Sequence, residues 1–178
     1  MRPLLWFSIL PFLFFSSCGD GNTINLVIDN PTNMIIEMSM DSLNVDVPSM
    51  HTVNLNISKG EHRLVLANDS VIRFNFTEPT YFINPSLSNY LITEEYYGPE
   101  EYLENRNTKI PKQEVSFSGI TLNGNYKIIS NVINNVNWDY GPRELLPKAL
   151  EINDDIAYTS AIKVFDAKEF INYINSKR

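Results

Sequence analysis

The chain has 178 residues and a formal net charge of −7 at pH 7, with 21 acidic residues against 14 basic ones. Because the basic residues form no patch along the sequence, this balance argues against nucleic-acid binding and against tight electrostatic docking on anionic lipid. The length allows one domain of ordinary size or two small ones. Cys18 is the single cysteine, so no intramolecular disulfide forms and stability has to come from packing.

Residues 1–17 form a short apolar leader that ends at Cys18. Arg2 precedes an apolar run from Leu4 to Phe15, and two serines separate that run from the cysteine. A positive charge, an apolar stretch and small residues before a cleavage site are typical of a secretory signal peptide. The run Phe15-Ser16-Ser17-Cys18 resembles the signal of bacterial lipoproteins, in which the cysteine is lipidated and becomes the first residue of the mature protein.

This resemblance implies a membrane anchor through lipid on Cys18. Each buried methylene contributes about 0.8 kcal/mol, so the two or three chains typical of this family anchor firmly, whereas a single chain binds marginally. Residues 18–22 would then form a short tether of glycine and small polar residues. The expected location is the bacterial cell envelope, at the outer membrane in preference to the inner one.

Two other interpretations of the leader stay open, namely an ordinary signal peptide with a chance cysteine and an uncut membrane anchor. The apolar run from Leu4 to Phe15 has twelve residues, against the roughly 20 that span a bilayer as a helix. Pro11 would also disturb a permanent spanning helix.

Alternating apolar and polar residues predict short strands throughout residues 23–78. Strands of this length with turns between them indicate an antiparallel β-sandwich. The expected strands are Ile24–Asn30, Met34–Met40, Leu43–Val47, Val53–Ile57, Leu64–Leu66 and Ile72–Phe76, with a hairpin turn at Ser58-Lys59-Gly60. Leu55, Leu64 and Phe74 are expected to face inward.

This first half resembles the small immunoglobulin-like or transthyretin-like modules of bacterial cell surfaces. The resemblance rests on the strands at Ile24–Asn30 and Leu43–Val47, and on Val53-Asn54-Leu55 leading to Lys59-Gly60-Glu61-His62. It implies a binding or spacer module in preference to an enzyme.

Residues 79–178 are expected to form a second β-rich region, and whether it packs with the first module stays open. Asn123-Gly124 is the strongest hairpin signal, and residues 100–112 are expected to form a loop or one short helix. Asp166 with Glu169 three residues later predicts a capped helix over 166–176. The remaining expected strands are Asn89–Tyr97, Glu114–Phe117, Ile120–Ile129 and Ala157–Phe165.

The residues that carry catalysis in known enzymes are sparse. His51 and His62 should lie on the order of 10 Å apart along a sheet, so we expect no metal site. Glu94 and Glu95 are adjacent in a strand and point to opposite faces, which a glycosidase pair cannot do. The sequence contains no Gly-x-Ser-x-Gly and no phosphate-binding glycine loop. We therefore expect no enzymatic activity and no cofactor.

Aromatic side chains are the remaining signal for a ligand. Tyr97, Tyr102, Trp138 and Tyr140 lie in turn-rich sequence beside carboxylates and amides. Flat rings of this kind can stack on sugars while polar neighbours bind hydroxyls, and the alternative is ordinary core packing with a wet polar tip. Asp41-Ser42-Leu43 and Asp69-Ser70-Val71 resemble sites that bacteria of the Bacteroidetes type O-glycosylate, so Ser42 and Ser70 are candidate modification sites in turns. The alternative is that Asp-Ser is ordinary turn chemistry without modification.

Together these features predict a lipid-anchored envelope protein with a non-catalytic binding, assembly or structural role. Its expected partners are a membrane, through Cys18, and an envelope protein or glycan whose identity the sequence does not give. A carbohydrate-binding accessory lipoprotein is the alternative, which an open cleft lined by Trp138 and Tyr97 would favour. An envelope hydrolase is the third choice, which a carboxylate pair facing one cavity would favour.

Overall fold

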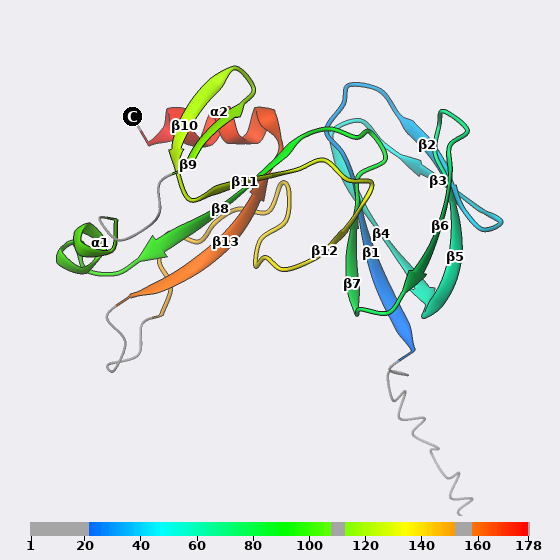
Figure 1. Cartoon of the computed structure of the whole chain (residues 1–178), viewed down its shortest axis with the longest axis horizontal. Coiled ribbons are helices and arrows are strands. Elements are labelled where there is room, and N and C mark those ends of the chain that lie inside the picture. The colour runs from blue at the N-terminus through cyan, green and yellow to red at the C-terminus, as the bar shows by residue number, and fades with distance from the viewer. Residues whose placement is uncertain (1–21, 108–112, 152–157, 178) are drawn as a thin grey trace, which may run out of the picture.

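The computed structural model describes residues 22–107, 113–151 and 158–177, so Cys18 and most of the expected tether lie outside the described residues. The fold is mainly β, with several small sheets and a helix near the C-terminal end. Figure 1 shows two β-rich units side by side, which we call the sandwich and the helix-covered unit.

The sandwich consists of two four-stranded sheets. One sheet has the order β12-β7-β1-β4, and the other has the order β3-β2-β5-β6. The first contains β1 (Thr23–Asn30), β4 (His51–Ser58), β7 (Thr80–Ile83) and β12 (Ile133–Asn135). The second contains β2 (Ile36–Met40), β3 (Leu43–Val47), β5 (Gly60–Val65) and β6 (Val71–Phe76). Pairing is antiparallel except between β1 and β7, which run parallel.

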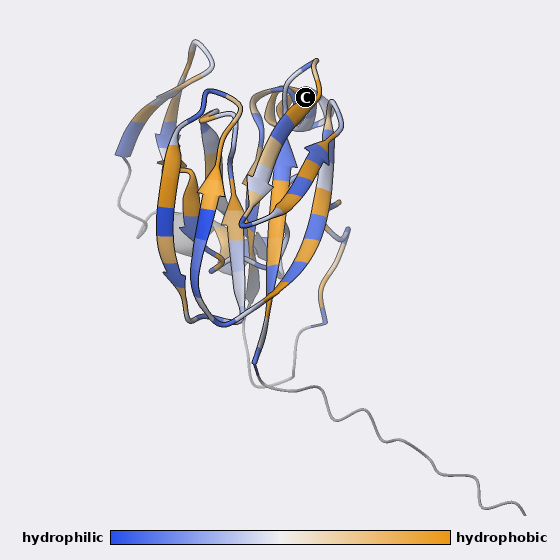
Figure 2. Cartoon of the chain, turned by 90° about the vertical axis from the view of Figure 1, so that its right-hand side faces the viewer, coloured by the Kyte–Doolittle hydropathy of each residue, from blue (hydrophilic) through white to orange (hydrophobic). Residues whose placement is uncertain are grey.

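The core of the sandwich follows from the alternation along each strand. Ile24, Leu26 and Ile28 are fully buried, while the residues between them are less so, because successive side chains point to opposite faces. Figure 2 shows hydrophilic and hydrophobic residues alternating along the strands that face the viewer. Leu64 is buried, and Leu55 and Phe74 pack half-buried against the same cluster, so the three expected inward positions are confirmed.

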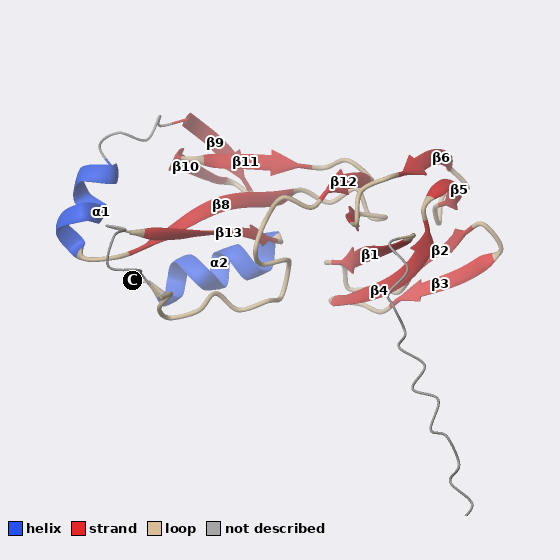
Figure 3. Ribbon diagram, turned by 90° about the horizontal axis from the view of Figure 1, so that it is seen from below, coloured by secondary structure: helices blue, strands red, loops and turns tan. Residues whose placement is uncertain are grey.

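The helix-covered unit is built on a three-stranded sheet with the order β11-β8-β13. Its strands are β8 (Tyr90–Tyr97), β11 (Tyr126–Ile129) and β13 (Thr159–Phe165), and a separate hairpin contains β9 (Gln113–Phe117) and β10 (Ile120–Gly124). The helices are α1 (Glu100–Asn107) and α2 (Ala167–Ser176). Figure 3 shows α2 lying along one face of the sheet, where Phe170 enters a cluster with Leu91, Phe117 and Phe165.

The N-terminus of α2 confirms the expected cap. The Asp166 side chain accepts a hydrogen bond from the Glu169 backbone N–H at 2.8 Å, which satisfies one of the free amides of the first turn. The Glu169 carboxylate contacts Lys163 and the Arg143 backbone N–H.

Two expected hairpins are wrong. Ser58-Lys59-Gly60 joins β4 in one sheet to β5 in the other, so Leu55 does not lie opposite His62. The hairpin expected at Asn123-Gly124 lies instead at Ser118-Gly119, where both residues have positive φ, as a two-residue turn of type I′ requires. Gly124 has a different role, because a Cβ there would lie 2.8 Å from the Tyr126 ring.

The sandwich also extends past the boundary expected at residue 78. β7 and β12 complete its first sheet, and the chain enters the helix-covered unit between them, through β8 to β11. The two units are therefore joined by several chain crossings. In the described part of the chain, no helix combines the length and apolar character needed to cross a bilayer.

Candidate functional site

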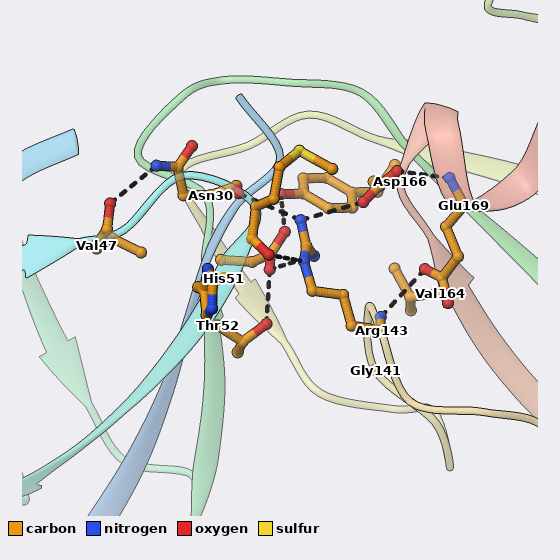
Figure 4. Close-up of polar contacts among 12 residues, drawn as sticks. Asn30, Val47, His51, Thr52, Gly141, Arg143, Val164, Asp166 and Glu169 are labelled. Carbon is orange, nitrogen blue, oxygen red and sulfur yellow. Dashed lines mark hydrogen bonds and ion pairs between the residues drawn. The ribbon is translucent and has the colours of Figure 1, made fainter. Parts of the chain in front are cut away.

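The junction between the two units holds the most unusual group of residues in the structure. Arg143 lies at its centre in the loop before β13, and its guanidinium bridges both units (Figure 4). Nη1 donates to Asp29 Oδ1 of β1 at 2.6 Å, and Nη2 lies 3.1 Å from Asp166 Oδ2 at the cap of α2. Nε donates to the Met50 carbonyl at 2.8 Å, and Nη2 also donates to the Asn30 carbonyl at 3.2 Å.

The Asp29 carboxylate is the acceptor at the sandwich side of this junction. It is fully buried, and besides the guanidinium it accepts hydrogen bonds from the Tyr90 hydroxyl and the Thr52 hydroxyl, each at 2.7 Å. Burial and the neighbouring carboxylate raise the pKa of Tyr90 well above its usual range, because both disfavour a phenolate. A buried charge with three donors, one of which is its ion-pair partner, is compensated.

A second ion pair continues the network into the helix-covered unit. Lys163 of β13 is almost fully buried, and its ammonium contacts Glu169 Oε1 at 2.7 Å, the Gly141 carbonyl at 2.6 Å and the Val164 carbonyl at 2.9 Å. Burial lowers the pKa of Lys163, and the hydrogen bond to Glu169 opposes that shift. Since the ammonium has three protons and three acceptors, its bonding capacity is filled.

The backbone of Arg143 is held in an uncommon conformation. Its φ is 66°, in the left-handed region, where a residue with a Cβ is roughly 1 to 2 kcal/mol less stable than in the right-handed helical region. Its backbone N–H donates to Glu169 Oε2 at 3.2 Å, so both the backbone and the side chain are fixed by the two units. Such strain persists only where the surroundings over-determine the conformation.

Apolar packing closes the junction beside the charges. Phe82 of β7, Tyr90 of β8 and Val164 of β13 form one buried cluster. The Phe82 ring meets the Tyr90 ring edge to face at 5.0 Å between centroids and the Trp138 ring at 5.5 Å. The two units are thus joined by a continuous apolar and ionic contact.

A groove of about 370 Å³ opens beside the guanidinium, between the 141–144 loop and the outer surface of β1 and β4. Its polar lining comes from Asn25, His51, Thr52, Asn54, Arg143 and Glu144. The carboxylate of Glu144 already accepts the Gly141 N–H at 2.7 Å. Amide and hydroxyl side chains in such a groove can hydrogen-bond a polar ligand.

The structure does not bring the four expected aromatic residues into one site. Tyr97 lines a cleft of about 410 Å³ with Tyr96, Gly98, Pro99, Leu103 and Lys148, and Trp138 is not part of that cleft. Trp138 packs against Phe82 at the junction, and Tyr140 forms a parallel bridge with Lys163. Tyr102 of α1 is 44% exposed.

The two histidines lie on different sheets of the sandwich. His51 Nδ1 lies 2.7 Å from the Ser49 carbonyl. His62 Nδ1 lies 2.6 Å from Asp41 Oδ2, and His62 Nε2 lies 2.9 Å from the Ser58 carbonyl. Within the described ranges, no three His, Cys, Asp or Glu side chains are placed to hold a metal.

Carboxylates do face one shallow hollow, on the outer surface of β2 and β3. Glu37 and Asp46 are cross-strand partners there, and Asp69 also lines this hollow, which has a volume of about 300 Å³. All three side chains are exposed. Enzymes that use two carboxylates hold them in different, partly desolvated environments, which this open face does not offer.

Ser42 and Ser70 occupy equivalent positions in two turns. Each is exposed and follows an aspartate with positive φ, 54° at Asp41 and 63° at Asp69. The aliphatic residue after each serine is about half exposed, 51% at Leu43 and 50% at Val71. An enzyme could therefore reach both hydroxyls and the residues that flank them.

Sequence reasoning missed Asp29, Arg143 and Lys163. Alternation gives no signal for Asp29, because Ile24, Leu26 and Ile28 face the sandwich core and Asp29 points to the opposite face, which only the junction buries. Comparison of the chain with protein-family models, with curated proteins and with solved structures finds no match, so its site is interpreted from its own geometry.

Proposed function

We propose that the protein is a lipid-anchored envelope protein with a non-catalytic role, in which the junction fixes the helix-covered unit against the sandwich. The observation that carries this proposal is the use of the buried charges. Each charged group at the junction contacts another charged group or the backbone, and these groups belong to Asp29, Arg143, Asp166, Lys163 and Glu169. Charged groups whose hydrogen bonds are all made within the protein hold the two units together and are poorly placed to transfer protons to a substrate.

The lipid anchor is the part of the proposal that rests on sequence. Cys18 lies five residues before Thr23, where β1 begins, and five residues span at most about 18 Å. A lipid on Cys18 would therefore hold the Thr23 end of the sandwich close to the bilayer. The Lys59 backbone N–H donates to the Asn22 carbonyl at this end, which ties the start of the domain to the β4–β5 connection.

A rigid junction suits such a role, because a tether alone gives no orientation. With the two units fixed, a surface on the helix-covered unit keeps a constant position relative to the anchored end of the sandwich (Figure 1). Envelope proteins and glycans are the partner classes that this arrangement would serve.

The test is chemical cross-linking in the native envelope, followed by purification of the lipidated protein. We expect defined cross-linked species that disappear in an Arg143→Met variant that is still folded and lipidated. An exposed substitution far from the junction, Lys59→Met, serves as the matched control and should keep the species. Identical species in all three proteins would contradict a role for the fixed junction, and a substrate turned over by the purified protein would contradict the non-catalytic assignment.

A carbohydrate-binding role remains the second candidate, and the cleft beside Tyr97 is the observation that favours it. The cleft combines a tyrosine with Pro99 and Lys148 and has about 410 Å³, which is enough for a small ligand. Because Trp138 packs at the junction instead, the paired aromatic platform expected from the sequence is not formed in this cleft.

A further inference from the structure

Glu95 lies among tyrosine side chains on the helix-covered unit. Glu95 and Tyr97 share one face of β8, Tyr126 comes from the neighbouring strand β11, and Tyr173 comes from α2. Burial, and then the charge of Glu95, raises the pKa of Tyr97 and Tyr126, and burial with a hydrogen bond to Glu95 raises that of Tyr173. We call these four residues the Glu95 cage.

An ammonium group already contacts two members of this cage, Glu95 and Tyr173. Lys177 Nζ lies 2.8 Å from Glu95 Oε2 and 4.4 Å from the centroid of the Tyr173 ring. A carboxylate and an aromatic face together are the chemistry by which proteins bind organic cations. The short N···O distance indicates N–H donation, which a primary ammonium provides and a quaternary one lacks.

The occupant is held less firmly than the cage that receives it. The Lys177 side chain is 55% exposed, whereas that of Glu95 is 23% exposed. The end of α2 does not depend on the ammonium, because the Lys177 backbone N–H donates to the Ile174 carbonyl at 3.3 Å. Exposed ion pairs of this kind add little stability, so a ligand of similar chemistry can displace Lys177.

We propose that the Glu95 cage binds the primary ammonium of a lysine-type side chain on a partner, and that Lys177 is an intramolecular occupant which the partner displaces. The occupant itself favours this partner chemistry, since it is a butylammonium group. Tyr97 also lines the cleft of about 410 Å³, which gives the rest of the ligand a surface to contact. The inference goes beyond the proposed function, because it would hold for the same protein without a lipid anchor.

The experiment is titration of the mature protein with n-butylammonium by calorimetry or by NMR of the tyrosine rings. The cation–π contact and the exposed ion pair of Lys177 together favour the state in which Lys177 contacts the cage over the state in which it is free, by roughly five- to tenfold. Lys177→Ala should therefore bind n-butylammonium about five to ten times more tightly than the unmodified protein. Adding Glu95→Gln to Lys177→Ala should abolish binding, and tetramethylammonium should bind more weakly than n-butylammonium to Lys177→Ala.

Lys59→Ala is the matched control, because it removes an exposed lysine from the sandwich, and it should leave the affinity unchanged. Melting curves confirm that each variant is folded. Equal affinity in the unmodified protein and Lys177→Ala, or binding that survives Glu95→Gln, would overturn the proposal. Tighter binding of O-phosphoethanolamine than of n-butylammonium would overturn the lysine assignment in favour of a lipid headgroup.

Discussion

Substitution of Arg143 by Met should destabilise the whole protein, because it leaves buried carboxylates without their cation. Asp29 would keep its hydrogen bonds from Tyr90 and Thr52 but lose the guanidinium at 2.6 Å, and Asp166 would lose its contact at 3.1 Å. Removing one partner of a buried pair typically costs about 3 to 5 kcal/mol. Since a domain has only about 5 to 15 kcal/mol in total, the loss is a large fraction.

The assay is urea unfolding followed by tryptophan fluorescence. Trp138 is the single tryptophan outside the leader, and it packs against Phe82 at the junction, so it reports directly on this contact. Arg143→Met should lower the unfolding midpoint and split the transition, because two units without their ionic contact can unfold separately.

Asp29→Asn in the Arg143→Met background provides the control for this reasoning. It removes the unpaired buried charge and keeps one oxygen that can accept from Tyr90 or Thr52, while the amide N–H can donate to the other hydroxyl. The double variant should therefore be more stable than Arg143→Met alone. Arg143→Gly should also be more stable than Arg143→Ala, because glycine relieves the positive φ at that residue. If Arg143→Met lowers the free energy of unfolding by less than about 1 kcal/mol, the account of the junction is refuted, because the loss of an exposed ion pair costs that little.

Three further predictions concern the core, the alkaline range and the exposed serines. Leu64→Ala should lower the free energy of unfolding by about 2 to 5 kcal/mol in urea titrations, with smaller losses for the half-buried Leu55→Ala and Phe74→Ala; changes within about 0.5 kcal/mol at all three would mean that the strand faces are assigned wrongly. Because the pKa of Tyr90 is raised in the folded state, its protonated hydroxyl stabilises the fold fully at pH values below the unfolded-state pKa of 10.0. This stabilisation is lost as the pH rises above 10.0. Melting temperatures should therefore fall above pH 10 with a smaller slope in Tyr90→Phe, and an unchanged slope would contradict the role of burial. Mass spectrometry of the protein from its native source should find sugar on Ser42 and Ser70, and bare serines at both positions would remove that prediction.

The alternation and capping signals in the sequence predict the helices and strands well, but they predict poorly which strands pair with one another. Alternation placed β3 at Leu43–Val47 and the capping pair placed α2 after Asp166, because both signals lie within a few neighbouring residues. The same alternation cannot tell a hairpin from a connection between two sheets, so the hairpin expected at Ser58-Lys59-Gly60 pairs the wrong strands. Register and partner depend on contacts that are distant in sequence.

The candidate site was out of reach for the same reason. Arg143 and Asp29 are 114 residues apart, and neither belongs to a motif of fixed spacing. The Glu95 cage combines two strands and a helix, and its tyrosines look like ordinary core residues in the sequence. The turn-rich sequence around Tyr97 indicates a ligand candidate, whereas nothing in the sequence singles out Tyr126 and Tyr173, because only the fold brings them to Glu95.

The most direct test of the lipid-anchored assignment is metabolic labelling with an alkyne fatty acid, comparing the native protein with Cys18→Ala. The account predicts that the native protein takes up label, loses residues 1–17 and fractionates with membranes. Cys18→Ala should take up no label and should leave the membrane fraction. Label and membrane association that persist in Cys18→Ala would contradict the central claim.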